Sequence, residues 1–178
     1  KVEDQHAVQH IDTIIDQADA IMVARGDLGV ECPFEDLPIL QREIVRSCQV
    51  IGKPVIVATH MLESMCQEPV PTRAEVTDVA NAVFEQADAI MLSGEPSVGK
   101  FPNRCVQAMD RIARRMEREP AARFHGLASL TNDRQKLAKT AVNMADDLDA
   151  KAIVVFTRVG RLVPEVAWMR PCRAPILA

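Results

Sequence analysis

Short apolar runs recur along the chain, and each ends at a polar residue or a glycine. They lie at residues 20–24, 55–58 and 89–92 and are typical of buried strands, since a buried helix needs a longer run. Their starts are about 35 residues apart, and a stretch with helical spacing of apolar residues fills each interval. This alternation predicts parallel βα units, either in a barrel or in a doubly wound sheet.

Several of the helical stretches have recognisable ends. An amphipathic stripe predicts one helix over residues 4–17. Pro38 in a first turn and Gly52 after a last turn delimit the next helix, and Thr72 with Glu75 fits a capping box. Further along we expect a helix over 105–119, a helix over 133–148, a strand over 152–156, a turn at Gly160, a helix over 162–169 and the start of a strand at Ile176.

Composition excludes several classes of protein. The chain has 178 residues, 48% of them apolar, and its net charge of −4 gives no electrostatic footprint for nucleic acid or for an anionic membrane surface. No apolar run approaches the ~20 residues that span a bilayer, and no signal peptide is recognised. We expect the five cysteines to be reduced thiols rather than a disulfide framework or a zinc site, because their number is odd and no C-x-x-C pair occurs. The chain opens without Met and ends as a strand begins, so we expect a piece of a longer protein.

One sequence pattern occurs twice. Residues 15–22 return almost unchanged at 84–91, and the two copies run into Arg-Gly-Asp and Ser-Gly-Glu respectively. In parallel α/β folds the carboxyl ends of the strands meet at one edge, where active sites are built. The polar side chains expected at this edge are those of Lys1, Glu3, Arg25, Asp27, Thr59, His60, Ser93 and Glu95.

The residue types at this edge suit the binding of a metal ion and an anion. Glu3 and Asp27 are oxygen donors of the kind that Mg²⁺ prefers, and Lys1 offers a compact cation for a phosphate or a developing enolate. We expect Gly26 and Gly29 to mark a place where the backbone either turns tightly or approaches a ligand closely. If Gly26 and Asp27 instead open a helical turn, their N–H groups would form a cradle for an anion. Asp27 could equally be a helix cap or a loop residue, and a plain structural histidine remains an alternative for His60.

Two other patterns have plainer alternatives. His6 and His10 have the i, i+4 spacing of a metal pair, but nothing else supports one, and we expect a solvent-facing helix surface. The turn formed by Thr157, Arg158, Val159, Gly160 and Arg161 could bind phosphate through its N–H groups and two guanidinium groups. A simple strand-to-helix turn explains the same residues.

Several stretches resemble pyruvate kinase. They occur in that family's order and spacing at residues 21–31, 53–59, 61–65, 71–83 and 88–95. The tail resembles, more weakly, the start of the family's C-terminal regulatory domain. The resemblance implies an α/β fold in which residues 1–120 hold strands five to eight of a parallel (β/α)₈ TIM barrel. Residues 121–129 would be a linker, and 130–178 the first part of an α/β C-terminal domain.

The resemblance also implies roles for individual residues. Lys1 would stabilise the phosphoryl group in flight, and Glu3 and Asp27 would hold Mg²⁺ or Mn²⁺. Gly26 and Asp27 would contact the substrate carboxylate through their backbone, and Thr59 would lie beside the carbon that is protonated. The side chains expected to support the site without touching substrate are those of Arg25, Ser93 and Glu95.

The implied activity is glycolytic transfer of phosphate from phosphoenolpyruvate to ADP, giving pyruvate and ATP. The family's K⁺ site would lie outside this chain, and the parent protein would be a cytoplasmic homotetramer, with a plastid as the alternative location. Other readings are a different Mg²⁺-dependent phosphoenolpyruvate or oxoacid barrel enzyme, and an inactive binding or assembly module. Half a barrel leaves unpaired sheet edges and an exposed core face, so we expect this chain alone to be inactive.

Three positions depart from the family pattern. His60 stands where Gln or Asn is usual, and Pro96 replaces the usual Thr after Ser-Gly-Glu. Val159 occupies a position where members regulated by sugar phosphates commonly have Ser. We therefore expect weak or absent activation by fructose 1,6-bisphosphate.

Overall fold

The computed structural model describes all residues, 1–178, and divides them into two compact units. The first comprises Lys1–Cys48 and Lys53–Arg123, and the second comprises Gln49–Gly52 and Phe124–Ala178. None of the helices combines the length and apolar character that a membrane-spanning segment requires.

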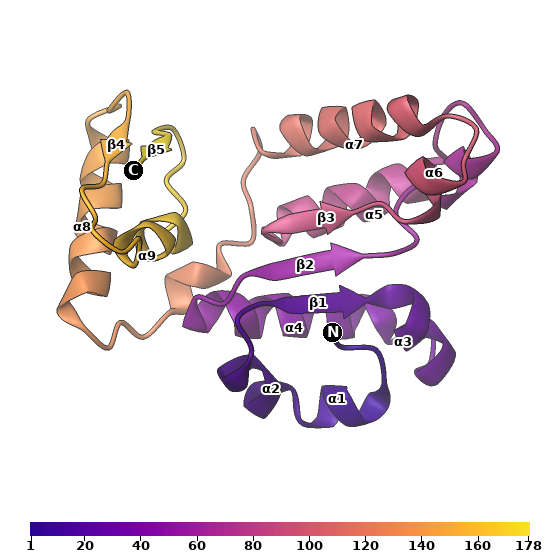
Figure 1. Cartoon of the computed structure of the whole chain (residues 1–178), viewed down its shortest axis with the longest axis horizontal. Coiled ribbons are helices and arrows are strands. Elements are labelled where there is room, and N and C mark those ends of the chain that lie inside the picture. The colour runs from indigo at the N-terminus through magenta and orange to yellow at the C-terminus, as the bar shows by residue number, and fades with distance from the viewer. The chain divides into compact units, whose positions relative to one another are not determined.

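A parallel sheet forms the centre of the first unit. Its strands β1 (Ile21–Ala24), β2 (Val55–Ala58) and β3 (Ala89–Met91) pair in the order β1-β2-β3 and run the same way (Figure 1). Val2 adds a parallel bridge to the outer side of β1, where its N–H donates to Met22 O at 2.8 Å. The predicted parallel α/β architecture is confirmed.

Two of the helices around this sheet have the ends that their sequences predict, whereas the helix expected over 105–119 begins and ends three residues earlier. The helices α4 (Leu37–Ile51) and α5 (Arg73–Phe84) lie between successive strands, and α7 (Pro102–Met116) follows β3. Thr72 and Glu75 form the predicted capping box at the start of α5. Gly52 ends α4 with a φ of 78°, in the left-handed region that glycine adopts without strain.

Only one face of the sheet lies in the core. Val2, Val23 and Val57 are fully buried and pack with apolar side chains of the surrounding helices. On the opposite face Met22 and Ile56, which are in register, are only partly buried, and Ala89 beside them is exposed. This second face is therefore partly exposed around Met22, Ile56 and Ala89, whereas Ala24 and Ala58 at its carboxyl end are buried.

One prediction at the N-terminal end is wrong, and one pair of alternatives is decided. The single helix expected over residues 4–17 is two helices, α1 (Gln5–Gln9) and α2 (Ile11–Gln17), separated at His10 by a non-helical ψ of 22°. The break lets apolar side chains from both helices reach the same core. The tight turn that was one alternative at Gly26 and Gly29 does not form, because these residues lie in the short helix α3 (Arg25–Glu31), which is the helical turn considered for Gly26 and Asp27.

The second unit contains a smaller α/β arrangement with its own apolar core. Helices α8 (Asp133–Asp147) and α9 (Leu162–Trp168) accompany the parallel pair β4 (Ile153–Val154) and β5 (Ile176–Leu177). The strand predicted over 152–156 is thus shorter than expected, because its partner is only two residues long. The elements that the sequence did not predict are η1 (Glu63–Cys66), α6 (Gly94–Ser97) and η2 (Phe124–Leu127).

Candidate active site

The chain leaves β2 in a strained conformation. Thr59 and His60, directly after the strand, have φ angles of 68° and 52°. Positive φ is uncommon outside glycine, and for a β-branched residue such as threonine it is an outlier. Strain of this kind persists only where surrounding contacts enforce it, and it is concentrated at functional sites.

The buried guanidinium of Arg25 supplies contacts that hold this strained segment. Arg25 follows β1 directly and donates to Thr59 O from Nη2 at 2.6 Å and from Nε at 3.1 Å. Nη2 also donates to His60 O at 2.9 Å, and Nη1 forms an ion pair with Asp78 Oδ2 at 2.6 Å. Arg25 therefore joins the carboxyl ends of β1 and β2 and fixes where the Thr59 side chain lies.

Gly26 contacts the same segment through its backbone. Its N–H donates to Thr59 Oγ1 at 2.7 Å, and the Thr59 hydroxyl in turn donates to Ala58 O at 2.6 Å. A Cβ atom at position 26 would lie 3.3 Å from both Thr59 Oγ1 and His60 Cε1, so a side chain here would crowd the segment. The Gly26 N–H that we expected to face an anion is thus occupied by the Thr59 hydroxyl in this structure.

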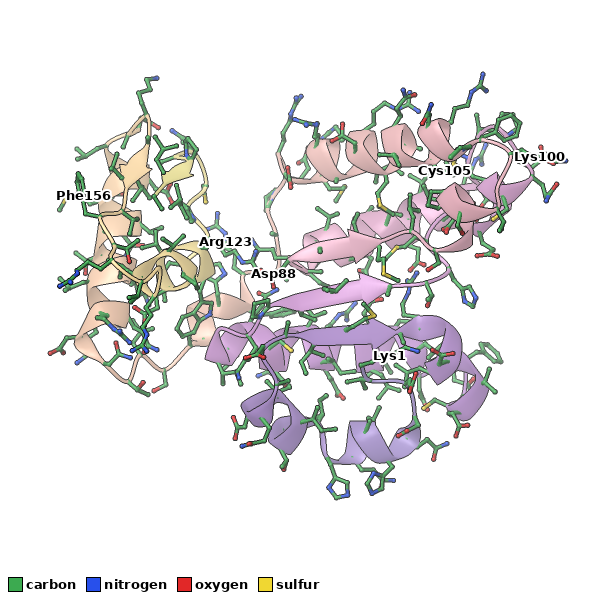
Figure 2. All side chains as sticks on the ribbon, in the orientation of Figure 1. Lys1, Asp88, Lys100, Cys105, Arg123 and Phe156 are labelled. Carbon is green, nitrogen blue, oxygen red and sulfur yellow. The ribbon has the colours of Figure 1, made fainter.

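The bridge at Val2 brings Lys1, Glu3 and Asp27 together. The Lys1 ammonium lies 2.5 Å from Glu3 Oε2 and 2.8 Å from Asp27 Oδ2, and about half of each side chain is exposed. Figure 2 shows Lys1 beside the carboxyl end of β1, whereas Asp88 lies near the opposite end of the sheet. Hydrogen bonds to Asp27 and then Glu3 raise the pKa of Lys1 above its ordinary value. Lys1 therefore stays protonated at any physiological pH.

The two carboxylates fit a metal ion that is shared with a substrate. An oxygen of Glu3 and an oxygen of Asp27 contact the same ammonium nitrogen, so both face one small volume where a cation is favoured. Mg²⁺ is commonly bound through one or two carboxylates, with water and substrate oxygens completing its coordination. No group of three or more His, Cys, Asp or Glu side chains that could hold a metal ion is gathered in the chain.

Glu95 lies behind the edge of the sheet and is fully buried. Its Oε1 accepts from Leu62 N at 3.0 Å and its Oε2 accepts from Ser93 N at 2.7 Å. The Ser93 hydroxyl oxygen is buried without a hydrogen-bond partner. Glu95 thus connects the segments that follow β2 and β3 through their backbone.

A buried polar network behind Arg25 was not predicted from the sequence. Gln41 Oε1 accepts from Arg25 Nη1 at 3.4 Å, while Gln41 Nε2 donates to Glu85 Oε2 at 2.8 Å. Glu85 is fully buried, and its Oε1 accepts from Asn81 Nδ2 at 3.1 Å and from Arg42 Nε at 3.2 Å. The available signal was the position of Gln41, a polar residue on the apolar face of α4. Asp78, the ion-pair partner of Arg25, was also missed.

The two histidine patterns have different surroundings. His60 lines a pocket of about 230 Å³ together with Arg25 and Asp78. His6 and His10 are exposed, and their ring centroids lie 4.6 Å apart in an edge-to-face arrangement. No acidic or thiol side chain joins this pair to make a larger metal-binding group.

The candidate effector turn belongs to the second unit. Thr157 Oγ1 accepts from Gly160 N at 3.0 Å, and Gly160 has a φ of 76°. The side chains of Arg158 and Arg161 are exposed, as is Val159 between them. The turn is therefore closed by its own threonine and presents two cations to solvent.

The fold and the edge cluster together define a class of protein. A parallel α/β sheet carries a lysine, two acids and a strained threonine at the carboxyl ends of its strands, the place where enzymes of this class perform their chemistry.

Comparison with known proteins identifies the family. Residues 1–106 match the pyruvate kinase barrel domain. A pyruvate kinase from Bacillus licheniformis is 46% identical and aligns with 100% of this chain and 31% of its own length. One from Leishmania mexicana is 48% identical over 96% of this chain and 36% of its own length. The crystal structure of a pyruvate kinase from Cryptosporidium parvum superposes with a TM-score of 0.94 at 38% identity, covering 99% of this chain and 37% of that one.

The chain belongs to the pyruvate kinase family. It spans about a third of the length of the curated relatives that it matches.

Proposed function

We propose that this chain is the second half of a pyruvate kinase catalytic barrel, with strands five to eight in residues 1–120. Residues 121–129 form a linker and 130–178 begin the C-terminal regulatory domain. The parent protein transfers a phosphoryl group from phosphoenolpyruvate to ADP, which gives pyruvate and ATP in glycolysis. The observation that carries the proposal is the Lys1 ammonium held between Glu3 and Asp27 at the carboxyl edge of the sheet.

The charges of this cluster suit phosphoryl transfer. Glu3 and Asp27 would hold Mg²⁺ or Mn²⁺, which when bound neutralises negative charge on the phosphate and enolate oxygens. Lys1 supplies a permanent positive charge to the phosphoryl group as it leaves the enolate oxygen. Positioning and charge neutralisation provide most of the catalysis in this kind of reaction, and a fixed ammonium provides both.

The substrate carboxylate would bind at the start of α3. The first N–H groups of a helix have no partner within it, so those of Gly26 and Asp27 are suited to an anion. A carboxylate that accepts from Gly26 N would displace the Thr59 hydroxyl, which now occupies that N–H at 2.7 Å. We infer that Thr59 then turns towards the substrate, beside the carbon that receives the proton. Arg25 and Glu95 hold the surrounding backbone, and the N–H of Ser93 donates to Glu95.

Membership of the family supports further proposals. A K⁺ ion would bind outside this chain, and the parent protein would be a homotetramer in the cytoplasm, or alternatively in a plastid. At the turn from Thr157 to Arg161, Val159 removes one hydroxyl donor, so we expect weak or absent activation by fructose 1,6-bisphosphate. Micromolar binding of that ligand at this turn, measured by isothermal titration with the parent protein, would contradict this expectation.

The partly exposed face of the sheet supports the inactivity of the isolated chain. Met22, Ile56 and Ala89 lie on a face that is only partly covered in this chain, and the other half of a barrel would bury it. We therefore expect the isolated chain to associate with itself or to be less stable than the longer protein.

A coupled assay tests the proposed function. Lactate dehydrogenase reports pyruvate formed from phosphoenolpyruvate, and the assay is run with this chain and with the longer protein that includes the residues encoded upstream. We expect ADP-dependent turnover from the longer protein and none from this chain. Pyruvate formed without ADP would indicate a different phosphoenolpyruvate enzyme, and no turnover by the folded longer protein would indicate a binding or assembly module. Substantial turnover by this chain alone would contradict its being half of a barrel.

A further inference from the structure

His6 and His10 form a pair of adjacent imidazole rings on the surface of the first unit. Both side chains are exposed, and their ring centroids lie 4.6 Å apart with an angle of 61° between the ring planes. His10 is the residue between α1 and α2, and its N–H donates to His6 O at 3.2 Å. This backbone bond closes one helical turn, so the two side chains leave the chain on the same side.

Neither imidazole is used by the fold. The ring nitrogens make no hydrogen bond within the chain, and His10 does not cap α2 with its side chain. Asp4 instead caps α1 by accepting from Ala7 N at 2.7 Å, and Ala7 and Val8 pack against the core of the unit. Other residues therefore anchor the helix, and each neutral imidazole keeps a nitrogen lone pair to offer to a ligand.

The separation of the rings matches two neighbouring ligand positions of a transition-metal ion. A metal–nitrogen bond of about 2.0 Å places the ring centroid about 3.2 Å from the metal. Two ligands at right angles then have centroids about 4.5 Å apart, and two ligands at the tetrahedral angle about 5.2 Å apart. The observed 4.6 Å fits the right angle. Both rings must still turn to aim a nitrogen at one ion, and the χ2 torsion of histidine is soft enough to allow this.

The ligand type and the angle together select the ion. Imidazole suits Cu²⁺ and Ni²⁺, which favour ligands at right angles, whereas Mg²⁺ prefers oxygen ligands. Affinity for nitrogen ligands is highest for Cu²⁺ among the divalent ions of the first transition row. No third His, Cys, Asp or Glu side chain joins the pair, so water would complete the coordination.

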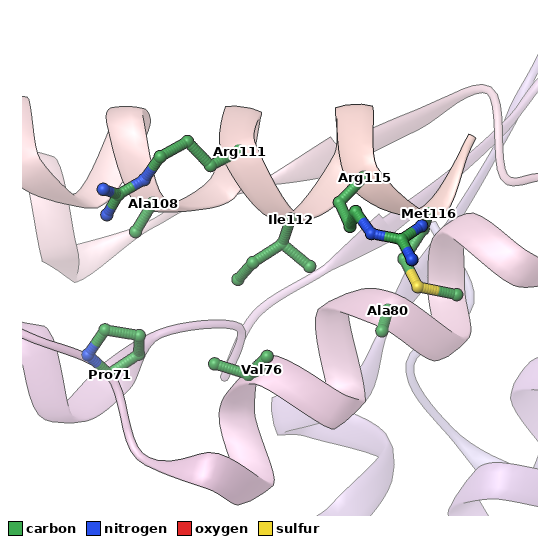
Figure 3. A pocket seen from close by; sticks show the side chains of 8 residues that line it. All are labelled: Pro71, Val76, Ala80, Ala108, Arg111, Ile112, Arg115 and Met116. Atoms are coloured by element: carbon green, nitrogen blue, oxygen red, sulfur yellow. The ribbon is translucent and has the colours of Figure 1, made fainter. Parts of the chain in front are cut away.

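Two hollows of the first unit lack this combination of ligands. The groove of about 350 Å³ between α5 and α7 is apolar apart from Arg111 and Arg115 (Figure 3). The pocket at His60 holds a single imidazole and the guanidinium of Arg25. Guanidinium groups repel a divalent cation, so neither hollow suits a metal ion.

We propose that His6 and His10 form a surface site for a divalent transition-metal ion with ligands at right angles, Cu²⁺ above all and then Ni²⁺. The two imidazoles occupy neighbouring ligand positions, and water occupies the others. The site shares no residue with the Lys1, Glu3 and Asp27 cluster, so the proposal does not depend on the reaction assigned to that cluster.

Proton NMR of the 178-residue chain locates the binding. Ni²⁺ is the probe, because Cu²⁺ would also oxidise the free cysteines. The Hε1 signals of the four histidines are followed, since a paramagnetic ion broadens the signals of nearby protons. We expect His6 and His10 to broaden together and in a saturable way, at Ni²⁺ concentrations that leave His60 and His125 sharp. Broadening of His60 or His125 at the same or lower concentrations, or sharp signals from His6 and His10, would overturn the proposal.

Three variants separate chelation by the pair from binding by one ring. His6→Gln and His10→Gln each remove one ligand, and His60→Gln removes an exposed imidazole elsewhere. We expect either of the first two to weaken Ni²⁺ binding at the remaining ring at least about tenfold, because the second ligand is held within reach of the first. His60→Gln should leave the broadening of His6 and His10 unchanged.

Other modes of binding give distinct results. Equal affinity of the unaltered chain and both single variants would show binding by one imidazole and would contradict the proposal. Loss of the broadening when Mg²⁺ is added in excess would place Ni²⁺ at Glu3 and Asp27, which also contradicts it. A broadening midpoint that falls as the protein concentration rises would indicate an ion shared by two copies of the chain, again against the proposal.

Discussion

The guanidinium of Arg25 donates two hydrogen bonds to the carbonyl oxygen of Thr59, from Nη2 at 2.6 Å and from Nε at 3.1 Å. Thr59 has a φ of 68°, so these bonds hold a β-branched residue in a conformation that it would not adopt alone. Arg25, which follows β1, therefore fixes the backbone conformation of Thr59, which follows β2.

Replacing Arg25 should destabilise the first unit. Arg25→Met leaves the carbonyls of Thr59 and His60 without their donor and Asp78 without its cation, and we expect a loss of about 2–4 kcal/mol. Arg25→Lys keeps the charge but cannot donate hydrogen bonds to both carbonyls. Its free energy of unfolding should therefore lie between those of Arg25→Met and the unaltered protein. Urea denaturation followed by far-UV circular dichroism measures the change.

Fluorescence and a surface variant provide the controls for this experiment. The only tryptophan, Trp168, lies in the second unit, so its fluorescence reports whether that unit is unaffected. Arg118→Met removes an exposed arginine and should leave the urea midpoint unchanged. If Arg25→Met had the same midpoint as Arg118→Met, Arg25 would not enforce the strained segment.

The buried pair of Gln41 and Glu85 should show energetic coupling. Gln41 Nε2 donates to Glu85 Oε2 at 2.8 Å inside the protein, and each side chain loses a buried partner when the other is removed. We expect Gln41→Leu and Glu85→Leu each to cost about 2 kcal/mol, because a single replacement leaves a buried polar group unsatisfied. The double variant should cost less than the sum by about 1–2 kcal/mol. Simple additivity in the same urea denaturation would contradict the coupling.

Glu75 should make the stability of the first unit fall as the pH becomes acidic. Burial alone would raise the pKa of Glu75, but hydrogen bonds from Ser64 and Thr72 outweigh it and hold the pKa below its ordinary value. The ionised Glu75 carboxylate therefore stabilises the folded state fully above the unfolded-state pKa of about 4.3. This stabilisation is lost as the pH falls through the lower folded-state pKa. Thermal unfolding between pH 7 and pH 3 should show a smaller loss for Glu75→Gln than for the unaltered chain. Glu68→Gln, at an exposed position, should keep the original pH dependence, and an equal slope for all three proteins would contradict this assignment.

The fold could be predicted where the sequence carries a local signal. The three strands, the capping box at Thr72 and the end of α4 at Gly52 follow from apolar runs and capping residues, which act within a few residues. The helix break at His10 could not be predicted, because the apolar spacing continues across it and packing decides the bend. The glycines of α3 suggested a turn. At position 26, however, a glycine is favoured because the Thr59 segment lies against it and would be crowded by a side chain.

The candidate site could be predicted only in part. The position of Lys1, Glu3 and Asp27 at one edge follows from the parallel order of the strands, and the structure brings all three into contact. The network of Gln41 and Glu85 depends on contacts between helices that are more than 40 residues apart. No spacing within either helix reveals such a contact, although a polar residue on an apolar helix face was a usable signal.

The most direct measurement of the central claim is the turnover number of the longer protein carrying Lys1→Gln. Lys1 supplies the charge that accompanies the phosphoryl group, so kcat for pyruvate formation should fall at least about 100-fold, as when one preorganised charge donor is removed from an active site. Lys139→Gln, at an exposed position on α8, should retain the original kcat. A Lys1→Gln protein with the same kcat as Lys139→Gln would contradict the assignment of the Lys1, Glu3 and Asp27 cluster as the site of phosphoryl transfer.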